Sequence, residues 1–153
     1  MTQFDTVLVD QAFFKDMDPH LLEIIAGFAS NVRFGADEWI FQEGEDATNF
    51  YLLRHGKVAL KAFVPGRGEV TIQTLGADDV LGWSWLFPPY RWHFGARALE
   101  LTRAIAFDGA CLRAKAEENH DLGYELFKRF SQKVIDRLQA TRLQLLDVYG
   151  VHA

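Results

Sequence analysis

Cysteine is almost absent from the sequence, which contains only Cys111 among 153 residues. One thiol forms no intrachain disulfide and no zinc site built on several thiolates. The surrounding letters, FDGACLRAKAEEN, are typical of a helix start. We therefore interpret Cys111 as a small buried or half-buried thiol rather than as a nucleophile.

Catalytic and metal-binding patterns are also missing. Oxygenases with rolls of short strands hold their metal with several convergent His and carboxylate ligands, but no H-x-H pair occurs here. No GxSxG motif and no Walker loop occurs either. The five histidines are scattered: His20, His55, His93, His120 and His152. The sequence predicts a protein that is not an enzyme and that holds no metal.

Positive charge and long apolar runs are in short supply. The chain has 16 Lys and Arg against 21 Asp and Glu, a formal net charge of −5. Nucleic-acid affinity depends on clustered Lys and Arg, so direct binding of nucleic acid is not expected. No stretch approaches the ~20 apolar residues that span a bilayer, and the N-terminus does not resemble a signal peptide. We expect a cytoplasmic protein without a membrane segment.

What is present divides by periodicity into three parts of one domain, 1–153. Residues 10–31 show helical spacing, with an N-cap and first-turn proline at Asp18 and Pro19 and an earlier turn at Phe13 and Phe14. Residues 32–108 consist of short β-branched and aromatic runs separated by turn residues, with a hairpin at PGRG. Residues 110–149 return to helical spacing. The predicted fold class is α+β, mainly β.

The last helix carries two apolar stripes. One stripe has steps of three or four residues, close to the seam of a coiled coil, and consists of Phe130, Val134, Leu138, Thr141 and Leu145. A second stripe lies beside it: Leu126, Ile135, Leu146 and Tyr149. We expect one stripe to pack on the β-domain and the seam to form a homodimer interface. In the alternative, the chain's own core absorbs both stripes.

Three segments carry a resemblance to a known family. WIFQEGEDATNFYLLRHGKVALKAF (residues 39–63) resembles the opening strands of cyclic-nucleotide-binding domains, and EVTIQTLGADDVLG (69–82) resembles the next two, with Asp78 where the family usually has glycine. DRLQATRLQLLDVYG (136–150) is similar to the dimerisation helix of bacterial Crp/Fnr-like regulators. The resemblance implies an antiparallel, jelly-roll-like β-roll with N-terminal helices and a long C-terminal dimerisation helix.

The resemblance also implies that the segment after Gly82 is a phosphate-binding cassette. In the family a glutamate of this cassette accepts the ribose hydroxyl, and an arginine pairs with the cyclic phosphate. Here Trp83 stands at the glutamate position and Trp92 at the arginine position, followed by His93. We therefore predict weak or absent binding of cyclic AMP and cyclic GMP.

Two other residues keep a ligand role open. Arg91 lies one residue from the arginine position, and strand alternation directs it to the opposite face unless a bulge restores its direction. Thr141 resembles a residue that contacts the purine base, although it can also pack its methyl group and bond to its own helix. The candidate ligand-binding residues are Gly82, Trp83, Ser84, Trp85, Arg91, Trp92, His93 and Thr141.

The aromatic stretch LGWSWLFPPYRWHFGARAL, Leu81 to Leu99, holds three of the chain's four tryptophans. Its side chains can fill the pocket, can line a changed pocket for another small aromatic or acidic ligand, or can form a docking surface for a separate protein partner. We expect a stand-alone, dimeric sensor or adaptor with no cofactor beyond such a ligand. The alternatives are a genuine cyclic-nucleotide sensor, including the truncated sensor half of a Crp/Fnr-type transcription regulator, and a ligand-free scaffold.

Overall fold

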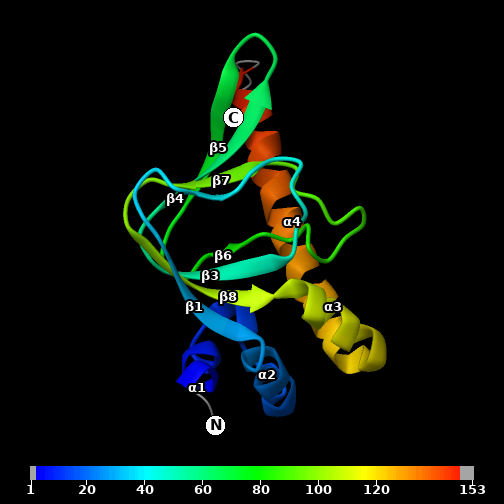
Figure 1. Ribbon diagram of the computed structural model, residues 1–153. Coiled ribbons are helices and arrows are strands. Elements are labelled where there is room, and N and C mark those ends of the chain that lie inside the picture. Colours follow the sequence, from blue (N-terminus) through cyan, green and yellow to red (C-terminus); the bar gives the residue numbers. More distant parts are fainter. Residues whose placement is uncertain (1–2, 149–153) are drawn as a thin grey trace.

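Two four-stranded antiparallel sheets face each other in the computed structural model, which describes residues 3–148 (Figure 1). The helices are α1 (Gln3–Val9), the 3-10 turn η1 (Ala12–Phe14), α2 (Pro19–Ala26), α3 (Gly109–Glu118) and α4 (His120–Val148). The strands are β1 (Ala29–Phe34), β2 (Trp39–Phe41), β3 (Asn49–His55), β4 (Val58–Val64), β5 (Gly68–Leu75), β6 (Val80–Leu81), β7 (Gly95–Ala98) and β8 (Thr102–Asp108).

The strand order explains the roll. One sheet has the order β1-β8-β3-β6 and the other has β2-β7-β4-β5, so consecutive strands alternate between sheets at several points. The β4–β5 hairpin turns at Pro65 to Gly68, as predicted, and it projects beside the C-terminal end of α4 (Figure 1). The expected antiparallel, mainly β roll is confirmed.

The N-terminal helices cover the outer face of the β1-β8-β3-β6 sheet (Figure 1). The Asp18 carboxylate accepts a hydrogen bond from the His20 backbone N–H at 2.8 Å, so the predicted cap of α2 is present. The turn at Phe13 and Phe14 is also present, and both rings are buried. The helical part begins at Gln3 rather than at residue 10, because α1 has an apolar face that packs on the core.

The β part differs from the prediction at two places. Its first strand begins at Ala29, not at residue 32, because Ala29 pairs with Phe107 across the sheet. The run WHFGARAL is a strand only at Gly95–Ala98. Its first residues bond to the loop after β2 instead: the Trp92 N–H donates to the Glu45 carbonyl, and the Trp92 carbonyl accepts from the Gly44 N–H.

The start of α3 corrects the interpretation of Cys111. Asp108 caps the helix by accepting from the Cys111 backbone N–H at 3.0 Å, so the predicted helix start is present. The thiol is exposed, however, because it lies on the solvent side of the first turn. The neighbouring Asp108 carboxylate raises the pKa of the thiol, which disfavours the thiolate.

The expected division of α4 into a core stripe and a partner stripe is wrong. Burial changes along the helix instead: members of both stripes are buried up to Phe130, and members of both are exposed beyond Val134. Phe130, predicted to lie in a dimer interface, is 1% exposed and contacts the rings of Phe13 and Phe50. Tyr149, assigned to the second stripe, lies outside the described residues.

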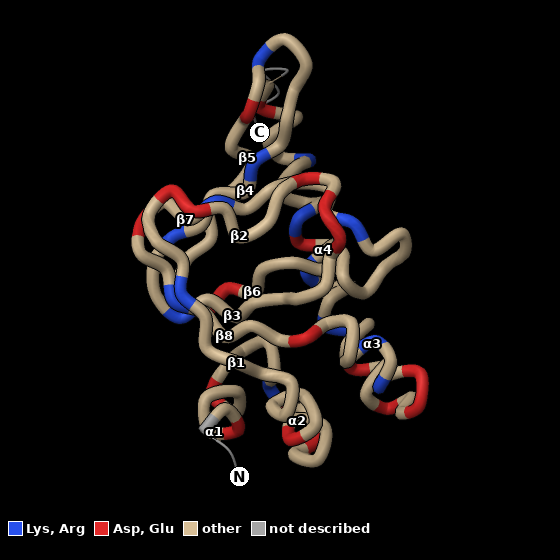
Figure 2. The backbone as a smooth tube through the Cα atoms, in the orientation of Figure 1, with Lys and Arg blue, Asp and Glu red and all other residues tan. Residues whose placement is uncertain are grey.

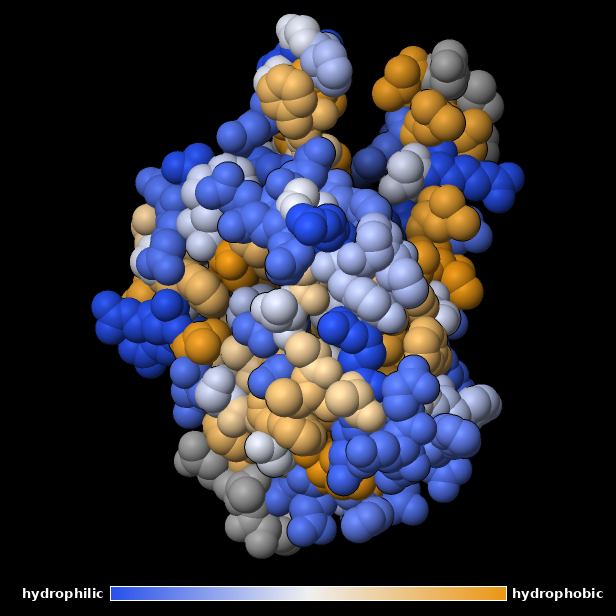
Figure 3. Space-filling model, turned by 45° about the vertical axis from the view of Figure 1, so that its right-hand side comes forward, coloured by the Kyte–Doolittle hydropathy of each residue, from blue (hydrophilic) through white to orange (hydrophobic). Residues whose placement is uncertain are grey.

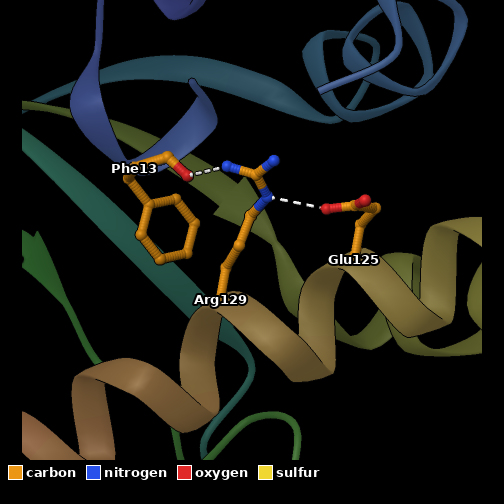
Figure 4. Close-up of polar contacts among 3 residues, drawn as sticks. All are labelled: Phe13, Glu125 and Arg129. Atoms are coloured by element: carbon orange, nitrogen blue, oxygen red, sulfur yellow. Dashed lines mark hydrogen bonds and ion pairs between the residues drawn. The ribbon is translucent and has the colours of Figure 1, made fainter. Parts of the chain in front are cut away.

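One polar contact attaches the first half of α4 to the N-terminal turn (Figure 4). The Arg129 guanidinium donates to the Phe13 carbonyl at 2.6 Å and pairs with the Glu125 carboxylate one turn earlier at 2.9 Å. Both side chains of the ion pair are largely buried. A hydrogen-bonded, partly desolvated pair of this kind resists screening by salt, so it fixes α4 against η1.

Lys and Arg residues and Asp and Glu residues are both spread along the backbone (Figure 2). Within residues 3–148, every helix is too short or too polar to cross a bilayer.

Candidate functional site

The aromatic loop, residues 82–94, connects β6 to β7 and lies against α3 and α4. Arg113 of α3 fixes it at two points. Its guanidinium donates to the Trp85 carbonyl and lies over the Tyr90 ring, 3.9 Å from the ring centroid. A planar cation held by a carbonyl and an aromatic face gives this loop a defined position on the helical layer.

Trp85 is a core residue. Its ring is fully buried and lies 5.0 Å from Phe50 and 5.2 Å from Phe130 between centroids. Gly109 makes room for it, since a Cβ at that position would lie 2.9 Å from the indole. Trp85 was predicted to contact a ligand or a partner, but its burial under α4 leaves it accessible to neither.

Trp92 is also inside the roll. Its indole is stacked on Phe41 with a centroid distance of 3.7 Å and an interplanar angle of 7°. Gly82 faces it with φ +96°, and a Cβ there would lie 2.6 Å from the indole. Only glycine combines that backbone conformation with that approach. The ring therefore occupies interior space at the position where the resemblance expects a phosphate-binding arginine.

Arg91 faces outward, so the hypothesis that a bulge turns it toward the pocket is wrong. Its guanidinium donates to the Gly44 carbonyl at 3.0 Å and lies 3.4 Å from the Asp46 carboxylate. Both side chains of this pair are exposed. Arg91 thus joins the loop after β2 to the aromatic loop from the solvent side.

Between the aromatic loop and α4 lies an apolar cavity of about 370 Å³. Its walls come from two elements: Trp83, Ser84, Phe87 and His93 of the loop, and Ser131, Val134 and Ile135 of α4. Trp83 is half-buried and meets Phe94 edge to face at 5.7 Å. The cavity has the size of a small-molecule site and the predominantly apolar lining that such sites have.

The sequence prediction found part of this cavity. Of the candidate residues, the structure brings Trp83, Ser84 and His93 together around it. Thr141 is exposed on the second half of α4 and is not among the residues that line it. Phe87 belongs to the aromatic stretch that was expected to fill or line the pocket, Ser131 was missed, and Val134 and Ile135 were assigned to the two stripes of the last helix. The spacing of Ser131, Val134 and Ile135 at three and four residues was the available signal.

Ser84 is a polar group without a partner in this apolar setting. Its side chain is 2% exposed, and its Oγ makes no hydrogen bond with any residue from 3 to 148. A buried hydroxyl without a partner destabilises the folded state by about 1 to 3 kcal/mol.

A smaller, more polar cavity of about 220 Å³ also borders Trp83. Arg137 of α4 lines it, with its guanidinium 5.3 Å from the Trp83 ring centroid and 5.5 Å from that of Phe94. Burial lowers the pKa of Arg137. Sequence reasoning did not single out this residue.

The described part of the chain offers no metal centre. No group of three or more His, Cys, Asp or Glu side chains converges within residues 3–148.

Comparison with known proteins agrees with this architecture. The family model described as "Cyclic nucleotide-binding domain" matches residues 31–119. No curated protein sequence matches the chain significantly.

Three solved structures illustrate the likeness. A putative cyclic nucleotide-binding protein from Geobacter metallireducens is 29% identical, with a TM-score of 0.80 over 90% of this chain and 99% of that one. The sensor domain of the transcriptional regulator DNR from Pseudomonas aeruginosa is 18% identical, with a TM-score of 0.70 over 90% and 95% of the two chains. The regulatory domain of Toxoplasma gondii PKA, solved with cAMP, is 18% identical, with a TM-score of 0.73 over 87% and 49%.

The family match spans more than half of the chain, and the two sheets, the N-terminal helices and the long final helix agree with the fold of these relatives. The chain belongs to the cyclic nucleotide-binding domain family.

Proposed function

We propose that the chain is a cytoplasmic regulatory sensor whose apolar cavity binds a small ligand other than cyclic AMP or cyclic GMP, and that it acts as a homodimer through the second half of α4. In this proposal the protein is not an enzyme. Ligand binding between the aromatic loop and α4 biases the position of the helix, and the dimer or a separate protein partner responds to that bias.

The observation that carries the proposal is the pair of tryptophans at the family's two polar positions. Trp92 places a buried indole, stacked on Phe41, where a cyclic phosphate needs a cation. Trp83 offers only an indole N–H where a ribose hydroxyl needs an acceptor. Arg91, the nearest cation in sequence, is held outside by Asp46. A ribose phosphate would therefore lose its two strongest polar contacts in this pocket.

The apolar cavity supports a ligand over a fully filled scaffold. Trp85 and Trp92 fill part of the roll, but Trp83 and Phe87 are only half-buried and leave about 370 Å³ between them and α4. Ser84, whose hydroxyl makes no hydrogen bond with residues 3–148, is one of the residues that line this space. An occupant with an apolar body and one polar group satisfies both features.

The second half of α4 supports the homodimer. Leu138 and Leu145, two members of the predicted seam, are 64% and 54% exposed, and Leu143 and Val148 are exposed as well. Figure 3 shows hydrophobic side chains gathered along this part of the helix, beside the β4–β5 hairpin. A helix that exposes this much apolar surface is stabilised by a partner surface, and a second copy of the same helix presents a matching one.

The ligand proposal is tested by thermal shift and calorimetry on the purified protein. Cyclic AMP and cyclic GMP are expected to give no shift at about 1 mM, whereas a small aromatic compound that fits the cavity should raise the melting temperature by about 5 to 10 °C at 100 times its dissociation constant. Micromolar binding of either cyclic nucleotide would overturn the proposal.

A pair of variants ties any shift to the cavity. Ser131→Leu places a larger side chain in the cavity and is expected to abolish the shift. Gln132→Leu makes the same replacement at the next, exposed position and is expected to leave the shift unchanged. Equal shifts in both variants would place the ligand elsewhere on the molecule.

A further inference from the structure

The chemical class of the ligand follows from the groups around Trp83. This indole is the wall that the apolar cavity and the smaller, polar cavity share. A ligand lying against Trp83 in the apolar cavity is therefore separated from the polar cavity by a single, half-buried side chain.

Gln73, which lines the polar cavity, carries a side-chain acceptor without a donor. The Gln73 side-chain Oε1 is buried and makes no hydrogen bond with any residue in the described part of the chain. Buried carbonyl oxygens are almost always paired in native proteins, since an unpaired one destabilises the fold. This oxygen has almost no accessible surface, so an N–H or O–H group on a ligand pairs with it only after the Gln73 side chain turns toward the cavity.

The same cavity contains a cation without a counter-ion. Arg137 forms no ion pair with residues 3–148, and only the rings of Trp83 and Phe94 lie against its guanidinium. Cation–π contacts offset part of the lost hydration but not all of it. The lowered pKa of Arg137 has the direction expected for a desolvated cation with no acidic partner.

Each of the two acidic side chains that line the polar cavity already accepts a hydrogen bond. Asp79 accepts from the Gly76 backbone N–H at 2.8 Å, and Asp136 accepts from the Gln132 amide at 2.9 Å. These two carboxylates keep their negative charges, and Lys133 and Arg137 balance them on the wall of the cavity. An incoming anion therefore meets Arg137 without displacing an existing ion pair.

We propose that the ligand is a small aromatic carboxylate, with its ring against Trp83 in the apolar cavity, its carboxylate on Arg137 and an N–H or O–H group on Gln73 Oε1. This inference rests on the proposed function, because it requires the apolar cavity to be a ligand site. The ring matches the aromatic walls, and the planar guanidinium pairs with a carboxylate through two parallel hydrogen bonds.

The experiment compares indole-2-carboxylate with its neutral amide, indole-2-carboxamide, by calorimetry. The acid is expected to bind at least about tenfold more tightly, because charge-assisted hydrogen bonds are stronger than neutral ones. Arg137→Gln should remove that preference, and Arg137→Lys should retain part of it. Arg142→Gln, an exposed arginine on the same helix, should leave it intact.

A second measurement separates recognition from packing. If Arg137 is an uncompensated cation, Arg137→Gln keeps the melting temperature of the unliganded protein unchanged or raises it by about 1 to 3 °C. A fall of that size would mean that Arg137 packs against the rings for stability, and would overturn its assignment as a ligand group.

The remaining outcomes are distinct. Equal affinity for acid and amide, or an acid preference that survives Arg137→Gln, overturns the inference and leaves the proposed ligand cavity standing. No binding of the acid up to about 5 mM also overturns the inference. The proposed function fails as well only if the broader thermal-shift screen finds no ligand that the Ser131→Leu variant loses.

Discussion

The two halves of α4 have similar apolar content and opposite surroundings. In the first half, Leu122, Leu126 and Phe130 are buried under the β1-β8-β3-β6 sheet and the N-terminal turn. In the second half, Leu138, Leu143 and Leu145 are exposed to solvent. The helix itself does not change at Phe130, so the difference comes from what lies opposite each half.

This difference separates the first half of α4, which stabilises the fold, from the second half, which is exposed for contact with a partner. The first half joins the aromatic core through Phe130 and attaches to η1 through Arg129. Residues Val134 to Arg137, in between, line the two candidate cavities. A ligand bound there lies at the boundary between the fixed half and the exposed half, where it can influence both.

The largest expected effect is on assembly. Leu138→Glu combined with Leu145→Glu places four like charges in the proposed dimer interface, and should weaken association by about 4 kcal/mol or more, a thousandfold in the dissociation constant. Light scattering should then report the mass of a single chain. Gln139→Glu, on the same turn, is the control and should keep the mass of the dimer. A double variant that remains dimeric would remove the second half of α4 from the interface.

The next largest effect is expected on stability, from the buried first half of α4. Phe130→Ala removes a ring that contacts Phe13, Phe50 and Trp85, and should lower the free energy of unfolding by about 3 to 5 kcal/mol in urea denaturation. Phe127→Ala, three residues earlier and partly exposed, should lower it by less than half as much. Equal losses in the two variants would contradict the assignment of Phe130 to the core.

A smaller effect on stability is expected at Arg129, whose ion pair with Glu125 and bond to Phe13 attach α4 to η1. Arg129→Met keeps the aliphatic stem but removes the bonds to the Phe13 carbonyl and to Glu125, so it should lower the free energy of unfolding by about 1 to 3 kcal/mol. Lys128→Met, at the exposed position just before Arg129, should change the free energy of unfolding by less than about 0.5 kcal/mol. A loss that disappeared in high salt would mean that the pair behaves as a surface pair.

The smallest expected effect is a change of stability with pH that comes from Tyr51 of strand β3. Burial raises the pKa of Tyr51, so the folded chain holds this phenolic proton more tightly than the unfolded chain does. Its contribution to stability is complete below the ordinary value of about 10 and is lost as the pH rises through the raised pKa, with a slope of at most about 1.4 kcal/mol per pH unit. Urea titrations above pH 10 should show this slope in the native protein and not in Tyr51→Phe.

Much of the fold could be predicted because its signals are local. The Asp18–Pro19 pair caps its helix through a contact two residues away, and PGRG turns a hairpin whose two strands pair residue by residue. Asp78, at the family's glycine position, adopts φ +73°. The missed helix α1 and the early start of β1 depend instead on the sheet and core that they pack against.

The site was predicted less completely because its walls are joined across the fold. Trp83 and Ser84 were found from the resemblance, but their opposite wall, Ser131 to Ile135, comes from a helix almost fifty residues later. In the sequence, nothing distinguishes Trp85 and Trp92 from Trp83. Only the positions of Gly109 and Phe41 in the fold show that the rings of Trp85 and Trp92 are interior. Arg91 was a candidate until its bond to Asp46 placed it outside.

The sequence by itself determined most of the order of helices and strands, the family, and the presence of tryptophan at the two positions where the resemblance expects a glutamate and an arginine, because each of these depends on residue type and short-range spacing. The tertiary structure alone decided which aromatic rings are core and which line a cavity, where burial stops along α4, and that Arg137 lies against Trp83 without an acidic partner. Burial and the pairing of charges depend on the segments that the fold brings together from distant parts of the chain, and no local pattern records them.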